Sequence, residues 1–460
     1  MELLLSELKD RPVMVEANDE AIKSIKNGIW VYFFLLIFEG ALRKWVLPGL
    51  ASPLLVVRDP VAIWLIYLSW KRGLFPSTIY LQGMIVIGLI SVYTAFFVGH
   101  GNIVVALYGG RIFLVHFPLI FIIGRVFDRE DILKMGKVML YISVPMAILI
   151  SKQFYSPQSA WVNRGLANDL AGAGFAGSGD FKRPPGTFSF MSGNVSFFGL
   201  LAPFLLYYWF NLKKINMWLL LAASGAMLIA IPFSISRALF FQFSLTIIFA
   251  VIASMKKPEN FNKVLVALIA GLVGFVVLSQ TKFFNTATGA FTDRFTSAET
   301  QEGGLVKGTI GNRFFGGMLG DLSKSFDQPF WGYGVGMGTN VGSVLLSGSR
   351  TFLIAEGEWG RQLGELGPLM GILVILLRVG LTIKLGMASL RKMVAGDLLP
   401  WLLFSFAIQN LPLGAWAQPT SLGFCMIIGG LLIASLKGED VKDSSLISVD
   451  TLKEDIVETR

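Results

Sequence analysis

The chain has little charge, histidine or cysteine for its length. Only 15% of its 460 residues are charged, whereas soluble globular proteins carry about 25%. Its single cysteine, Cys425, excludes a disulfide framework and a thiolate metal site. The two histidines belong to no cluster with metal-ligand spacing, so we expect neither a metal nor another cofactor. The N-terminal residues mix both charge signs without an apolar core, unlike a signal peptide.

The sequence is rich in apolar residues. The chain is 54% hydrophobic and has 38 Phe and 11 Trp. Several apolar runs reach the roughly 20 residues that a transmembrane helix needs. The sequence therefore predicts an all-α polytopic membrane protein with about twelve transmembrane helices. The expected spans are residues 28–47, 52–70, 79–98, 103–124, 133–154, 188–210, 216–233, 237–255, 263–280, 363–387, 397–414 and 418–436.

Lysine and arginine set the expected orientation. The net charge of +9 could suggest nucleic acid, but in a membrane protein the distribution of positive charge between loops matters more. Short loops such as KRGLFP and NLKKIN all fall on one side and are rich in Lys and Arg. Cytoplasmic loops carry this excess, so both termini are expected in the cytoplasm and no nucleic-acid partner is expected.

Two long connections divide the chain. Loops longer than about 15 residues are usually functional or disordered, and we expect the second one to form short helices that cap the membrane domain on its outer, periplasmic face. The expected segments are a cytoplasmic N-terminal segment (1–27), a membrane domain with nine spans (28–280) that includes an outer loop (155–187), a large outer loop (281–362), three further spans (363–436) and a cytoplasmic tail (437–460).

Arginines on the outer side run against the positive-inside bias and therefore need a reason. Arg237 lies in a tight turn within IPFSISRALFFQF, Arg183 opens RPPGTFSFMSGN before a span, and Arg313 lies in GNRFF. A guanidinium fork suits phosphate, and helix N-termini favour anions. Three such arginines around one cavity would hold a diphosphate, although an ion pair with a nearby carboxylate remains an alternative for Arg237. Secondary candidates are Arg111, Arg294 and Arg361.

Ionisable residues inside the spans are functional candidates by default. For Glu39 with Arg43, and for Arg58 with Asp59, local pairing and function are equally good interpretations. Arg378 is expected to be structural and to point toward the inner half of its span. The segment AEGEWGRQLGELG places Glu358, Arg361 and Glu365 on one helical face at i, i+3 and i+7. That pattern predicts either an ion-pair cluster or part of a reaction site.

Several motifs occur in an order that resembles the O-antigen ligase and polymerase superfamily. They are RPPGTFSFMSGNVSFFGL, SISRALFF, NRFF, PFWGYGVGMG and WGRQLGELG, covering residues 183 to 375. The resemblance implies an inverting, metal-independent glycosyltransferase of the bacterial inner membrane that uses an undecaprenyl-diphosphate-linked glycan donor. It further implies that Arg237 and Arg313 contact the diphosphate and that Arg183 lines the same cavity. The implied partners are membrane lipid, a glycan, lipid or protein acceptor, and an envelope-biosynthesis complex.

The motif departs from the family at the expected base. The family's ligases usually have a His-Asn pair eleven residues before the glycine that ends the last motif, where this chain has Glu356 and Gly357. Glu356 or its rival Glu358 would then be the general base, since burial can tune a carboxylate toward neutral pH. Without the histidine we favour a polymerase of exopolysaccharide or O-antigen repeat units. A ligase stays the nearest alternative, and a flippase or transporter is an alternative of another class.

Overall fold

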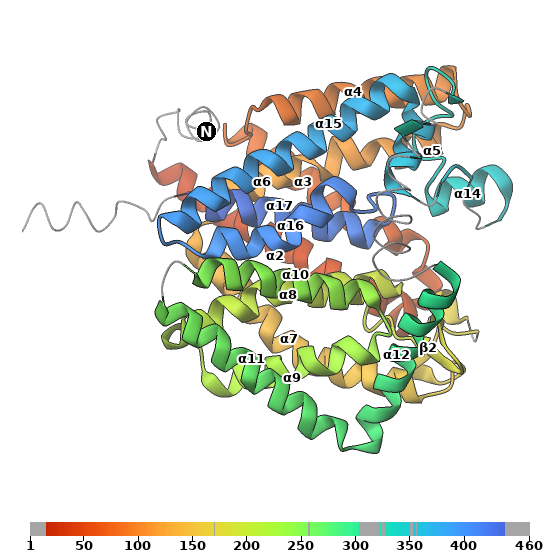
Figure 1. Cartoon of the computed structure of the whole chain (residues 1–460). Helices are drawn as coiled ribbons and strands as arrows, with labels where there is room; N and C mark the ends of the chain where they lie inside the picture. Colours follow the sequence, from red (N-terminus) through yellow and green to blue (C-terminus); the bar gives the residue numbers. More distant parts are fainter. Residues whose placement is uncertain are drawn as a thin grey trace, which may run out of the picture.

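The structure is a computed structural model that describes residues 15–169, 171–255, 258–302, 320, 322–323, 327–349, 353–355 and 357–437. Within these ranges the regular secondary structure is helical apart from one antiparallel hairpin (Figure 1). The helices are α2 (Val15–Ala41), α3 (Asp59–Lys71), α4 (Ile79–Phe97), α5 (Ile103–Arg111), α6 (Pro118–Val126), α7 (Arg129–Tyr155), α8 (Met191–Phe210), α9 (Met217–Phe233), α10 (Arg237–Ser254), α11 (Pro258–Ser279), α12 (Lys282–Glu302), α14 (Asn340–Ser347), α15 (Glu358–Val394), α16 (Leu399–Leu413) and α17 (Pro419–Ser435). The strands are β1 (Phe175–Ser178) and β2 (Phe181–Arg183), and two π-helical turns are η1 (Leu42–Val46) and η4 (Ile112–His116). Short 3-10 turns are η2 (Pro48–Leu50), η3 (Pro53–Val56), η5 (Trp161–Asn163), η6 (Leu166–Asn168) and η7 (Leu212–Lys214).

The prediction of an all-helical membrane protein is confirmed. Each predicted span overlaps one helix or a run of consecutive helices. Eight helical segments among the described residues are long and apolar enough to cross a membrane. They are 19–46, 53–71, 79–97, 103–126, 129–155, 191–210, 237–254 and 358–394. Shorter apolar helices cover 217–233, 269–279, 399–413 and 419–435.

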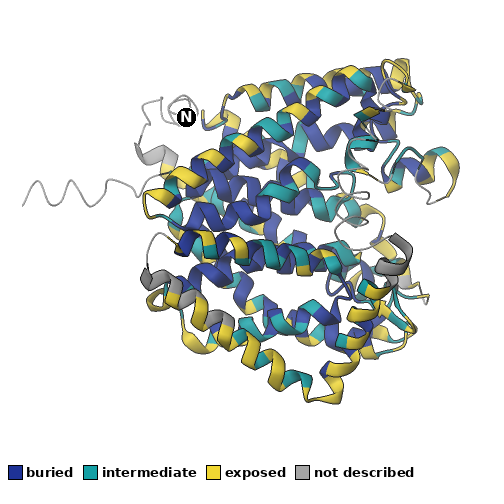
Figure 2. Cartoon of the chain, viewed as in Figure 1, coloured by how far each residue is buried: buried dark blue, intermediate teal, exposed yellow. Residues whose placement is uncertain are grey.

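Burial is organised around α17. This helix is apolar all round and buried from Leu422 to Ser435, as expected for a helix enclosed by others. It packs against α6, α16 and α8. Figure 2 shows the buried residues gathered toward the middle of the bundle and the exposed residues on its outward surfaces. Those outward surfaces carry large apolar side chains, among them Ile148 of α7 and Leu376 of α15, as a lipid-facing surface requires.

The described parts of the two long connections lie at one end of the bundle. The hairpin of β1 and β2 forms within residues 155–187, and α12 and α14 form within residues 281–362 (Figure 1). We call this end the hairpin end. Helices α2 and α16 finish toward it, and α3, α8, α10 and α17 begin there. Helix α14, with 8 residues, is short as expected. Helix α12 is longer, with 21 residues.

Helix α15 is bent sharply within the predicted span 363–387. Gly367 has φ +76° and ψ 173° within the helix, and the following Pro368 has no backbone N–H to donate. A Cβ at Gly371 would lie 2.9 Å from the Cα of Leu363, so the residues before the bend fold back along those after it. The helix therefore consists of a short arm, residues 358–366, and a long arm, residues 368–394.

The glycine-rich segment 332–338 holds this bend in place. The backbone N–H of Tyr333 donates to the Gly364 carbonyl at 2.8 Å, and that of Gly334 donates to the Glu365 carbonyl at 3.0 Å. A Cβ at Gly332, which has φ +69°, would lie 2.4 Å from the Glu365 carbonyl oxygen. Such close backbone approach needs glycine. The segment is a turn.

Replacing Gly367 with alanine should destabilise the protein. The residue has a positive φ, and a Cβ there would lie 2.1 Å from the Phe330 carbonyl oxygen, so we expect a loss of more than about 1 kcal/mol in unfolding free energy. The matched control is Gly225→Ala in α9, where a Cβ meets nothing within 4 Å and helix propensity improves. Thermal unfolding in detergent compares the two variants, and equal midpoints would contradict the strain at Gly367.

Candidate functional site

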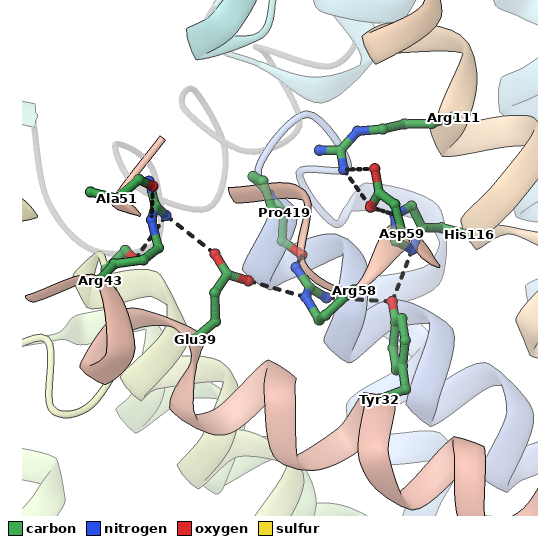
Figure 3. Close-up of polar contacts among 10 residues, drawn as sticks. Tyr32, Glu39, Arg43, Ala51, Arg58, Asp59, Arg111, His116 and Pro419 are labelled. Carbon is green, nitrogen blue, oxygen red and sulfur yellow. Dashed lines mark hydrogen bonds and ion pairs between the residues drawn. The ribbon is translucent and has the colours of Figure 1, made fainter. Parts of the chain in front are cut away.

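A network of charged side chains is buried at the hairpin end of α2 (Figure 3). Glu39 accepts from Arg43 at 3.2 Å through one carboxylate oxygen and from Arg58 at 3.1 Å through the other. All three side chains are almost inaccessible to solvent. The pairing of Glu39 with Arg43 is confirmed. Arg58 does not pair with its neighbour Asp59, because adjacent residues at a helix start point in different directions.

Asp59 is instead the centre of a second set of contacts. Its carboxylate accepts two hydrogen bonds from Arg111, both at 2.7 Å, and contacts Nε2 of His116 at 2.9 Å. The other ring nitrogen of His116 lies 3.0 Å from the Tyr32 hydroxyl, which also accepts from Arg58 at 3.4 Å. These contacts join Asp59 to the Glu39 group. We call the set Tyr32, Glu39, Arg43, Arg58, Asp59, Arg111 and His116 the first network.

A π-helical turn makes the Asp59 contacts geometrically accessible. In an α-helix, residues three or four apart share a face, whereas Arg111 and His116 are five apart. The turn η4 inserts the i to i+5 hydrogen bond from the Phe117 N–H to the Ile112 carbonyl, at 3.0 Å. The wider turn brings both side chains to one carboxylate. A second such turn, η1, contains Arg43 and Lys44.

The second network lies on the short arm of α15. Arg361 bonds to Glu365 and, at 2.9 Å, to Glu358, so the predicted face of these three residues is confirmed. Glu358 also accepts from Arg378 at 2.7 Å and from Gln362 at 2.9 Å. Arg378 lies on the long arm and reaches Glu358 only because the helix bends between them. The second network is thus Glu358, Arg361, Gln362, Glu365 and Arg378.

The turn between α16 and α17 joins the two networks. Arg378 donates to the Gly414 carbonyl at 2.8 Å and lies 3.7 Å above the ring of Trp416. At the other end of the same turn, Arg58 donates to the Pro419 carbonyl at 2.7 Å. Trp416 is buried and packs on Phe117, the residue after His116. The networks therefore form one continuous polar region inside an apolar bundle.

This polar region carries an excess of positive charge among the described residues. Lys44 adds to it: the ammonium is buried, donates to the Gly186 carbonyl at 2.7 Å and lies 4.5 Å from the Trp45 ring. Cationic groups inside a membrane bundle are costly and mark functional regions. The cations are Arg43, Lys44, Arg58, Arg111, Arg361 and Arg378, and the carboxylates are Glu39, Asp59, Glu358 and Glu365.

Two of the predicted phosphate-binding arginines lie on neighbouring segments. Arg237 is the first residue of α10 and half-buried, after a turn in which Ile235 has φ +47°. Arg183 ends β2 and contacts the sulfur of Met191, the first residue of α8, at 3.1 Å. It therefore lies in the hairpin rather than at the helix start. A Cβ at Gly177 of β1 would lie 3.0 Å from the Ile235 side chain, so the hairpin packs on the turn before Arg237.

Of the other predicted site residues, three lie in the two networks, one lies on α12 and two lie outside the described residues. Arg111 belongs to the first network, and Glu358 and Arg361 belong to the second. Arg294 is half-buried on α12, which packs against β1 and α10. Glu356 and Arg313 lie outside the described residues.

Sequence reasoning gave no role to His116 or Tyr32, whereas Lys44 is a candidate from sequence as an ionisable residue within a span, beside Glu39 and Arg43. A histidine within a long apolar span is a usable signal, because intramembrane ionisable residues are rare and functional by default. Tyr32 carries no such signal, since tyrosine is common near span ends. Comparison with protein-family models, curated proteins and solved structures finds no match to this chain. Function is therefore inferred from its residues and their geometry.

Asp59→Ala should be strongly destabilising. Removing one partner from a buried ion pair leaves the other charge uncompensated, which typically costs about 3–5 kcal/mol. Here Arg111 loses its anionic partner and His116 loses a hydrogen-bond partner. The control is Asp19→Ala, at an exposed position of α2, with an expected change within about 0.5 kcal/mol. Unfolding midpoints in detergent test this, and a midpoint for Asp59→Ala equal to that of the control would refute the role of Asp59.

Proposed function

We propose that this protein is a membrane glycosyltransferase that polymerises exopolysaccharide or O-antigen repeat units. The donor is an undecaprenyl-diphosphate-linked glycan, and transfer to an acceptor hydroxyl proceeds with inversion and without a metal. The hairpin end of the bundle faces the periplasm, about twelve helices cross the bacterial inner membrane, and both termini are cytoplasmic. The motif resemblance between residues 183 and 375 supplies the reaction class.

One observation carries the proposal: among the described residues, the polar region buried at the hairpin end holds more cations than carboxylates. The segment that follows Arg183 contacts this region through Arg43 and Lys44, and the hairpin packs on the turn before Arg237. A diphosphate leaving group gains negative charge as the glycosidic bond breaks. Fixed guanidiniums stabilise that developing charge without reorganising, so this end suits diphosphate departure.

Among the carboxylates, we assign the base to Glu356 and a positioning role to Glu358. The Glu358 carboxylate already accepts hydrogen bonds from Arg361, Gln362 and Arg378. These donors occupy the lone pairs of the carboxylate, which leaves little room for an acceptor hydroxyl to donate to it. Glu356 precedes it by two residues, at the position where family ligases have histidine.

Arg237→Ala should abolish glycan transfer while the protein still accumulates in the membrane. A lost phosphate contact in the transition state lowers turnover by about 100-fold or more. The matched control is Arg72→Ala, an exposed arginine after α3 at the opposite end of the bundle. The measurement is glycan length and attachment in cells that lack the native gene. Normal polymer in the Arg237 variant would refute its assignment.

The same cells separate the polymerase from the ligase. Loss of a polymerase leaves single repeat units attached to the acceptor, whereas loss of a ligase leaves finished polymer on the lipid carrier. For the base, Glu356→Gln should lose about 100-fold or more in turnover, whereas Glu358→Gln should act mainly on stability, because Arg378 and Arg361 lose a charged partner. Wild-type turnover in the Glu356 variant would refute its role as the base.

A further inference from the structure

A groove runs along the outside of the bundle between α7, α9 and α12. It has a volume of about 430 Å³ and an almost entirely apolar lining. Ile148 of α7 is 66% exposed on this face, so the groove opens to the surroundings of the bundle rather than to its core. Its lining includes Ile148, Ser151, Lys152 and Tyr155 of α7, Ile229 of α9 and Phe283 of α12.

The apolar lining contains one charged side chain, that of Lys152. Lys152 is exposed and lies three residues before the end of α7, at the hairpin end. No residue within the described ranges forms a hydrogen bond or ion pair with its ammonium. A lysine in the last turn of a transmembrane helix extends its ammonium toward the polar boundary of the membrane, where lipid phosphates lie. The groove is therefore apolar along its length and positive at one end.

The positive end of the groove adjoins the proposed diphosphate site. Phe181, the first residue of β2, stacks on Phe154 with ring centroids 4.4 Å apart and lies 6.4 Å from the Tyr155 ring. Two residues later, the same strand ends at Arg183. On the other side, Phe283 packs on Phe233, near the end of α9 and four residues before Arg237. Both arginines thus follow aromatic residues packed at the groove's end.

We propose that this groove holds the proximal part of the polyprenyl chain of the donor, with Lys152 on its phosphate. The identity of the donor rests on the proposed function, whereas the groove and its charge do not. An amphiphile with an apolar chain and an anionic head matches the groove in both respects: the chain buries apolar surface and the phosphate accepts from the ammonium. The neighbouring arginines would take the rest of the diphosphate.

The test is binding of undecaprenyl diphosphate to the purified full-length protein, measured by native mass spectrometry from detergent micelles. Lys152→Gln removes the charge at an exposed position, and Ile229→Trp fills the groove. We expect Lys152→Gln to weaken binding by about tenfold, the effect of one lost charge-assisted contact, and Lys152→Arg to retain it. We expect Ile229→Trp to weaken binding by about tenfold as well, because the indole occupies the space of the apolar chain. The controls are Lys71→Gln at the opposite end and Leu221→Trp on an exposed face of α9.

Phosphatidylglycerol is the second probe, because a membrane phospholipid shares the chemistry of an apolar chain and a phosphate. Selective loss of undecaprenyl diphosphate binding in the Lys152 and Ile229 variants supports the proposal. Wild-type binding in both variants overturns it, and so does equal binding of phosphatidylglycerol with the same losses. Binding is measured without turnover, so normal glycan length and attachment in cells that lack the native gene would remove the proposed function and leave the groove as a lipid site.

Discussion

Compensation of buried charge is the constraint on which this structure depends. A guanidinium inside an apolar bundle needs a carboxylate, a carbonyl or an aromatic face, and leaving one uncompensated costs several kcal/mol. Arg58 meets this need with Glu39, Tyr32 and the Pro419 carbonyl. Arg378 meets it with Glu358, the Gly414 carbonyl and the Trp416 ring. Helices distant in sequence are tied together by these contacts, because no single helix supplies all the partners.

Departures from regular helix geometry follow from the same need. The π-helical turns η1 and η4 lie where charged side chains must converge, and the bend at Gly367 returns the short arm of α15 to Arg378. Each departure gives up regular hydrogen bonding locally. Such irregularities are frequent at functional sites, where geometry matters more than helix stability. Here they gather cations at the end of the bundle that we propose handles a diphosphate.

The two proposals rest on one series of neighbouring surfaces, which changes from apolar to positively charged. Apolar surface outside α7 and α9 leads to a single lysine, then to Arg183 and Arg237, and then to the buried networks. An amphiphilic donor would meet matching surfaces in that order, with its chain in lipid and its diphosphate among cations. The acceptor hydroxyl would approach from the aqueous side, near the acidic start of α15.

Much of this protein follows from local sequence properties. Apolar run length predicted the helices, because a span needs a minimum of apolar residues whatever surrounds it. Helical spacing predicted the contacts of Arg361 with Glu358 and Glu365, because i, i+3 and i+7 share a face. Tight turn chemistry likewise indicated the segment before Arg237.

Only the tertiary structure decided which charges meet across the bundle. Asp59 pairs with Arg111 and His116 rather than with Arg58, and Arg378 joins Glu358 across a bend. Such pairings depend on helix packing and on π-turns, which leave no periodic trace in the sequence. The groove beside Lys152 is of the same kind, since it exists only where three separate helices meet.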